Sequence, residues 1–129
     1  MRKIKRIAEL SLLKKESPVV LLASSSACVW CDRFKPIYNK LAEEMEGSGY
    51  TFVFLIVEDF MCTPRRVKEY FFDQFQEHIH ATPTIYIIDD GISKVPLDVL
   101  WSHVEKSFDI PSTRTYLIEQ LSRTEKSQL

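Results

Sequence analysis

Cysteine is scarce in this sequence, with three residues among 129. Three is too few, and odd in number, for a scaffold held together by disulfides. A chain of this length can bury enough apolar surface to fold without such crosslinks. A disulfide here is therefore expected to take part in chemistry rather than to hold the fold.

The sequence also lacks a large net charge and a long apolar run. Its 17 basic and 18 acidic residues leave a net charge of −1, so the composition favours neither nucleic acid nor an anionic membrane as a partner. No apolar run approaches the roughly 18 residues of a membrane-spanning helix. The basic N-terminus is interrupted by Glu9 and Ser11, which is typical of an amphipathic helix rather than a signal peptide. We expect a cytoplasmic protein, with a periplasmic or secreted one as the alternative if a signal peptide has been removed.

Unbroken apolar runs rich in β-branched residues predict the strands. The segments 19–24 and 50–57 lack polar alternation, which is typical of strands buried on both faces of a sheet. A third strand is expected at 82–91, because this segment ends in an Asp-Gly hairpin signal. The segment 92–101 is then expected to return beside it.

Helical spacing of apolar residues connects these strands. It is clearest over 34–45, and further helices are expected over 3–15, over 62–79 with Thr63 as the N-cap, and after Pro111. A strand–helix–strand unit implies parallel strands, and the hairpin adds an antiparallel pair. The sequence predicts an α/β fold with a four-stranded mixed sheet sandwiched by helices. No repeat or linker divides the chain, so residues 1–129 are expected to form a single domain.

Cys28 and Cys31 stand at the transition from the first predicted strand to a helix. Unpaired backbone N–H groups and the helix dipole favour an anion at that place, so the pKa of the Cys28 thiol is expected to fall below its free value of about 8.5. Cys31 lies one turn inside the helix, where it is more buried and can resolve a mixed disulfide formed on Cys28. We predict that both cysteines are catalytic.

A zinc site is the main alternative for a C-x-x-C pair. Structural zinc requires four ligands. The remaining candidate ligands are Cys62, His78, His80 and His103. None of these provides a second closely spaced ligand pair of the usual kind, so the redox interpretation is favoured, and neither a metal nor a cofactor is expected.

The motifs "CVWCDRFKP" and "ATPTIYIIDDG" resemble the thioredoxin superfamily. Pro36 follows the second cysteine by five residues, where thioredoxins carry a helix-kinking proline. Thr82 and Pro83 resemble the cis-proline loop, which in this family lies against the active-site disulfide and binds the partner chain through its backbone. The resemblance covers residues 17–123 and implies a thioredoxin-like fold, with Thr82 and Pro83 as substrate-binding residues.

The sequence departs from the usual thioredoxin pattern near the cysteines. Thioredoxins have Gly-Pro between the two cysteines, whereas this chain has Val29 and Trp30, which we expect to form part of the substrate-binding surface. For Trp30, packing against residues 58–62 is the alternative. Leu22 stands where thioredoxins keep a buried acid. The first strand of a full thioredoxin is expected to be absent.

Three residues after the second predicted strand belong to the same edge of the sheet as the cysteine pair. For Cys62, a half-buried loop cysteine is favoured over a third redox thiol. For Glu58 and Asp59, a solvated pair is favoured over a replacement for the missing buried acid. The aromatic residues over 70–75 are expected in the core rather than in a binding groove.

The leading hypothesis is a thiol–disulfide oxidoreductase that exchanges electrons with protein disulfides. It would have protein disulfide or dithiol substrates and an upstream redox partner, and it is expected to be a monomer without nucleic-acid or membrane partners. The alternative is a thioredoxin-fold adaptor whose cysteines are non-catalytic or sense the redox state. The direction of catalysis stays open at this point.

Overall fold

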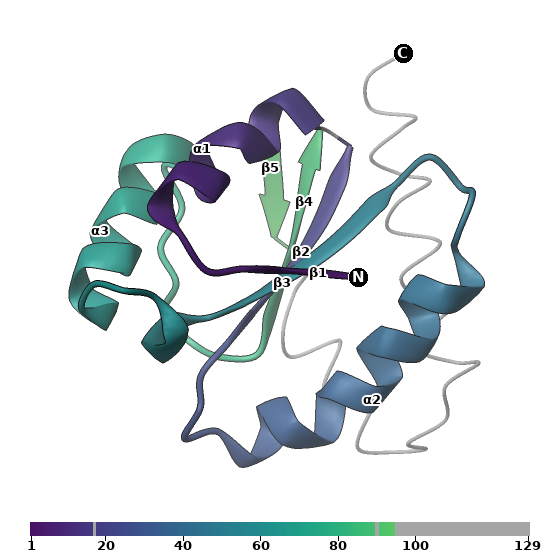
Figure 1. The fold of residues 1–129 in the computed structure, drawn as a ribbon, viewed down its shortest axis with the longest axis horizontal. Helices are drawn as coiled ribbons and strands as arrows, with labels where there is room; N and C mark the ends of the chain where they lie inside the picture. The colour runs from purple at the N-terminus through teal and green to yellow at the C-terminus, as the bar shows by residue number, and fades with distance from the viewer. Residues whose placement is uncertain (17, 90, 95–129) are drawn as a thin grey trace.

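A mixed five-stranded sheet forms the centre of the computed structural model, which describes residues 1–16, 18–89 and 91–94 (Figure 1). The strand order is β1-β3-β2-β4-β5. The strands are β1 (Arg2–Ile4), β2 (Val19–Ser24), β3 (Thr51–Ile56), β4 (Thr84–Asp89) and β5 (Gly91–Lys94). β3 runs parallel to β2 and to β1, whereas β4 runs antiparallel to β2 and to β5. The α/β class and the four predicted strands are confirmed.

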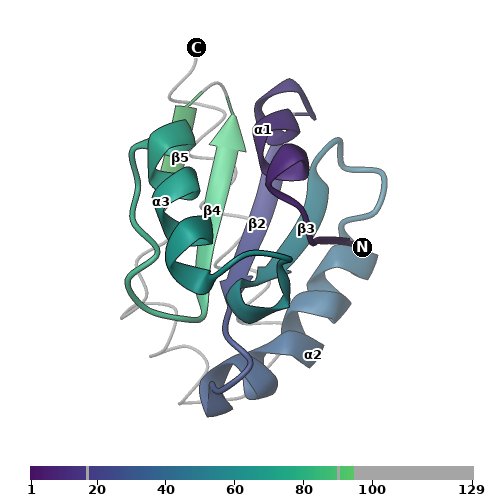
Figure 2. The same ribbon diagram turned by 60° about the vertical axis from the view of Figure 1, so that its left-hand side comes forward.

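Helices cover both faces of the sheet (Figure 2). Helix α2 (Val29–Glu44) lies on one face, whereas α1 (Ile7–Glu16) and α3 (Pro64–Phe75) lie together on the other. A short 3₁₀ turn, η1 (Val57–Asp59), leads from β3 toward α3. Because β2 and β3 are parallel, α2 and η1 both begin at the same edge of the sheet.

Two predictions for the N-terminus are wrong. Residues 3 and 4 belong to a strand rather than to a helix, and a first strand is present as β1. The segment is extended because Ile4 is fully buried and pairs with Leu55 of β3. The helix begins only at Ile7. The Glu9 carboxylate accepts hydrogen bonds from the backbone amides of Lys5 and Arg6, just before this helix. Three residues are too few for a sequence pattern to predict a strand.

The central strand β2 is buried along its whole length, as its unbroken apolar sequence predicts. Alternate side chains enter two separate clusters, one beneath α2 and one beneath α1 and α3. Val20 and Leu22 belong to the first cluster, whereas Leu21 and Ala23 belong to the second. Burying each large aliphatic side chain contributes about 1.5–3 kcal/mol. This packing fixes the end of β2, and therefore the start of α2, in the fold.

A buried tyrosine connects α2 to the sheet. The hydroxyl of Tyr38 lies 2.7 Å from the carbonyl oxygen of Val53 and 3.0 Å from that of Val20, and it is hydrogen-bonded to them. Tyr38 is fully buried, and burial raises the pKa of its hydroxyl well above the ordinary value. The helix that carries the cysteines is therefore held against both β2 and β3.

The boundaries of α3 differ in part from the prediction. Thr63 is the N-cap, since its hydroxyl accepts from the Arg66 amide at 3.2 Å, and Pro64 is the first helical residue. The helix ends at Phe75 rather than at 79, because Gln76 adopts a left-handed conformation with φ of 57°. The helix predicted after Pro111 and residues 95–101 of the segment 92–101 lie outside the described residues.

Candidate active site

Cys28 is the N-cap of α2 and forms a disulfide with Cys31 in the first turn of that helix. Their Cα atoms are 5.2 Å apart. Cys28 is half-buried, whereas only 4% of the Cys31 surface is exposed. The disulfide therefore lies at the start of a helix, as the sequence predicts. Cys31 is also more buried than Cys28, as predicted.

The backbone of α2 provides an electrostatic partner for the Cys28 sulfur. The amide N–H of Cys31 donates a hydrogen bond to Cys28 Sγ at 3.1 Å. The Asp32 amide donates to the Cys28 carbonyl at 3.2 Å and so begins the helical hydrogen-bond pattern. A thiolate on Cys28 would be stabilised there by this N–H and by the positive end of the helix dipole.

The segment around Pro83 lies beside the disulfide. The Thr82–Pro83 peptide bond is cis, and the Thr82 carbonyl oxygen lies 3.4 Å from Cys28 Sγ. Pro83 is buried, and Thr82 is half-buried. The structure thus brings together two motifs that are far apart in the sequence.

The two residues between the cysteines are exposed. Val29 exposes 67% of its surface and Trp30 exposes 41%. The Arg33 guanidinium lies 5.1 Å from the Trp30 ring, in the range of a cation–π contact. Met61, in the loop after η1, is 95% exposed, and sequence analysis did not single it out. Val29 and Trp30 therefore offer apolar surface to a partner beside the disulfide.

Apolar side chains surround position 22, where thioredoxins keep a buried acid and this chain has Leu22. Leu22 is 1% exposed and belongs to the cluster beneath α2. Leu22, Cys31, Asp32 and Lys35 are among the residues that line a small cavity of about 60 Å³. Both charged residues are themselves exposed on the helix surface. No carboxylate stands at position 22 to take a proton from Cys31.

Glu58 is exposed, as predicted, but it is hydrogen-bonded to the loop that precedes Cys28. The Ser25 hydroxyl lies 2.9 Å from each of its carboxylate oxygens, and the Ser26 amide donates to it at 2.8 Å. Burial alone would raise the pKa of Glu58, but the hydrogen bonds from Ser26 and Ser25 outweigh it and hold the pKa below the ordinary value. Asp59 has a different partner, the Lys3 ammonium at 2.5 Å. Sequence analysis missed Ser25 and Ser26, which carry no motif.

The remaining candidates are Cys62, the aromatic residues of α3 and the histidines. Cys62 is a half-buried free cysteine that packs against the core, as the favoured interpretation predicts. Phe71 and Phe75 are buried, whereas Phe72 is partly exposed and stacks on His78 at 4.2 Å. Within the described part of the chain, no group of three or more His, Cys, Asp or Glu residues could hold a metal ion. No helix among the described residues has the length and apolar character needed to cross a membrane.

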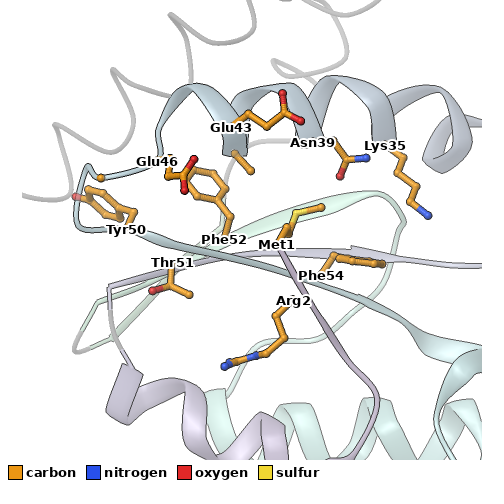
Figure 3. Close-up of a pocket in the computed structure, with 12 residues that line it drawn as sticks. Met1, Arg2, Lys35, Asn39, Glu43, Glu46, Tyr50, Thr51, Phe52 and Phe54 are labelled. Atoms are coloured by element: carbon orange, nitrogen blue, oxygen red, sulfur yellow. The ribbon is translucent and has the colours of Figure 1, made fainter.

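A larger pocket of about 690 Å³ lies between α2 and β3 (Figure 3). Its lining includes Lys35, Asn39 and Glu43 from α2 and two phenylalanines from β3, with Met1 and Arg2 at the N-terminus. Neither cysteine of the disulfide lines it. Sequence analysis gave no indication of this pocket, because it depends on side chains from three segments.

The fold and the disulfide at the start of α2 define a protein with the thioredoxin fold. No protein-family model and no curated protein matches the sequence. Solved structures do match, and several of them are thioredoxins. Mitochondrial thioredoxin 3 from Saccharomyces cerevisiae in its oxidised form is 21% identical, with a TM-score of 0.57 over 82% of this chain and 94% of that one.

Two further structures give the same result. Plasmodium falciparum thioredoxin is 19% identical, with a TM-score of 0.57 over 83% of this chain and 99% of that one. Thioredoxin O2 from Arabidopsis thaliana in its oxidised state is 19% identical, with a TM-score of 0.53 over 83% and 93%. At these identities the likeness establishes the fold, and the resemblance stated from the motifs is confirmed at that level. Together with the C-x-x-C pair, it supports thiol–disulfide oxidoreductase chemistry in general terms.

Proposed function

We propose that this protein exchanges electrons with protein disulfides through Cys28 and Cys31. One observation carries the proposal: Cys28 Sγ lies at the N-terminus of α2, 3.1 Å from a backbone N–H donor and in disulfide contact with the more buried Cys31. A thiolate is the reactive form of cysteine, and this environment favours it.

The exchange would proceed in two balanced steps. The Cys28 thiolate attacks one sulfur of the substrate disulfide, forming a mixed disulfide and releasing the other substrate sulfur as a thiolate. The Cys31 thiolate then attacks Cys28 Sγ, closing the intramolecular disulfide and releasing the second substrate sulfur. Two electrons pass to the substrate, whose thiolates take up protons, and the protein is left oxidised. An upstream dithiol protein must then return the two electrons, so no bound cofactor is needed.

The substrate would be held beside the disulfide mainly by backbone contacts. Thr82 and Pro83 adjoin Cys28, so an extended substrate segment could pair with the Thr82 backbone while presenting its disulfide to the sulfur. Val29 and Trp30 offer exposed apolar surface to the same segment. Such contacts do not depend on substrate charge, which suits a chain with a net charge of −1. We propose that the protein works as a monomer in the cytoplasm.

Reduction of insulin by dithiothreitol, followed as turbidity, tests this function. The wild-type protein should accelerate precipitation, whereas Cys28→Ser should not, because it lacks the attacking sulfur. Cys62→Ser serves as the matched control and should retain the wild-type rate. Equal rates for wild type and Cys28→Ser would remove the oxidoreductase interpretation.

The redox-sensing adaptor is a second candidate, since Leu22 leaves Cys31 without the buried acid of thioredoxins. An adaptor would form the disulfide yet fail to accelerate insulin reduction. For an active enzyme, the reduction potential in glutathione buffer gives the direction of catalysis. A reduction potential of about −270 mV would indicate a thioredoxin-like reductant, and a potential of about −120 mV would indicate an oxidant.

A further inference from the structure

The loop between β2 and α2 carries Cys28 but has little packing of its own. Its residues before the cysteine are Ser25, Ser26 and Ala27, of which the first is half-exposed and the other two are exposed. None of them adds a side chain to the two core clusters. The path of this loop must therefore be set by hydrogen bonds more than by apolar burial.

Glu58 supplies such hydrogen bonds from η1, the turn that follows β3. Its carboxylate accepts from the Ser25 hydroxyl at 2.9 Å and from the Ser26 amide at 2.8 Å. These partners are 33 and 32 positions away in the sequence, so the contact joins two separate connections of the fold. The two connections follow β2 and β3 at the same edge of the sheet (Figure 2).

We propose that Glu58 is a positioning residue for Cys28, which holds the Ser25–Ser26 loop so that the Cys28 sulfur stays at the N-terminus of α2. This inference deepens the proposed function and rests on it for its biological meaning. Glu58 acts through the loop, because its hydrogen bonds run to the two serines and not to the reacting sulfur. The adjacent acid, Asp59, has no such role, because its carboxylate pairs with Lys3 of β1.

Positioning and charge predict opposite effects on the Cys28 thiol, which makes the inference testable. A nearby carboxylate acting by its charge would disfavour the thiolate, so removing it would lower the thiol pKa. A carboxylate acting by position keeps the sulfur near the Cys31 amide, so removing it would raise the thiol pKa. The effect of a helix terminus falls off within one turn, so a displaced sulfur loses much of it.

The experiment measures alkylation of Cys28 by iodoacetamide across pH in the reduced protein of residues 1–129, with the site identified by peptide mass spectrometry. Glu58→Ala should move the midpoint to higher pH, corresponding to an about two- to fivefold lower acid dissociation constant of the thiol. Glu58→Gln should restore the wild-type profile within about twofold, because its amide can still accept from the Ser26 amide. Asp59→Asn removes the neighbouring charge and should leave the profile unchanged.

Ser25→Ala provides an independent variant, because it removes one partner of Glu58 from the loop side. It should shift the midpoint in the same direction as Glu58→Ala, and by less. An unchanged profile in both alanine variants would overturn the inference, as would a shift to lower pH in both Glu58→Ala and Glu58→Gln. The measurement uses no protein substrate. If the wild-type protein does not accelerate insulin reduction, that result counts against the proposed function and not against the role of Glu58.

Discussion

Cys28 Sγ lies 3.4 Å from the carbonyl oxygen of Thr82, although 54 positions separate the two residues. The same sulfur also accepts a hydrogen bond from the Cys31 amide at 3.1 Å. An N–H donor stabilises a thiolate, whereas a carbonyl oxygen can only accept a hydrogen bond from a thiol. A reduced Cys28 in this place would therefore have one neighbour that favours the thiolate and one that favours the protonated form.

Selective alkylation should distinguish the two cysteines of the pair. In the reduced protein at neutral pH, iodoacetamide should label Cys28 before Cys31, because Cys28 is half-buried at the helix terminus while Cys31 is buried. Peptide mass spectrometry of samples quenched at short times provides the measurement. Denatured protein is the control, in which the difference in rate should disappear. Faster labelling of Cys31 would reverse the roles assigned to the two sulfurs.

An acid introduced at position 22 should destabilise the fold. Leu22 is 1% exposed among apolar side chains, so Leu22→Asp would bury a carboxyl group without a prepared partner. We expect the free energy of unfolding to fall by about 3 kcal/mol or more at pH 7, as measured by urea denaturation. Leu22→Met keeps the volume and should cost less than about 1.5 kcal/mol. A stable Leu22→Asp variant would show that this position tolerates the acid found in thioredoxins.

The buried hydroxyl of Tyr38 should contribute measurably to stability. Tyr38→Phe leaves the carbonyls of Val20 and Val53 without this donor, so the free energy of unfolding should fall by about 1–2 kcal/mol. Tyr70→Phe is the matched control at a half-buried ring on α3, and it should change stability by less than about 0.5 kcal/mol. Equal effects of the two substitutions would argue against a structural role for the Tyr38 hydrogen bonds.

Glu58 should make part of the stability depend on pH. Its pKa in the folded protein is lowered, so its ionised form contributes stability above the unfolded-state pKa, and this contribution is lost as the pH falls through the folded-state value. The side chain introduced by Glu58→Gln does not titrate, so this variant lacks the contribution. At pH 7 the free energy of unfolding of the wild type should exceed that of Glu58→Gln by less than about 1 kcal/mol, as is usual for exposed groups. The difference should shrink as the pH falls from 7 toward about 3, because protonation of Glu58 removes this contribution. Urea denaturation at both pH values checks the sign, and a difference that grows toward low pH would contradict it.

The sequence predicted those parts of the fold whose residues follow a regular pattern. β2 was predicted because every one of its side chains is apolar or small, and α2 because its apolar residues recur with helical spacing. The cysteine pair and the Thr82–Pro83 motif also identified the two segments that meet at the site. Their meeting could be expected only from the resemblance, because nothing in the local sequence specifies a contact over 54 positions.

The parts that could not be predicted depend on single contacts between distant residues. β1 spans three residues, and only its pairing with β3 makes it a strand. The hydrogen bonds from Ser25 and Ser26 to Glu58 involve common polar residues, and no spacing distinguishes them from solvated serines and acids. The large pocket between α2 and β3 likewise arises from side chains of three separate segments.

The short strand β1 also shields the backbone of its neighbour. It occupies the outer side of β3, pairing with residues from Val53 to Leu55. If residues 1–5 were removed, the N–H and C=O groups on that side of β3 would become an open sheet edge, next to the apolar side chains of the core. An open edge of this kind is a template for pairing with another chain. Because β1 spans only three residues, it leaves a shorter row of N–H and C=O groups on this side of the sheet than β3 would, a role unrelated to the cysteines.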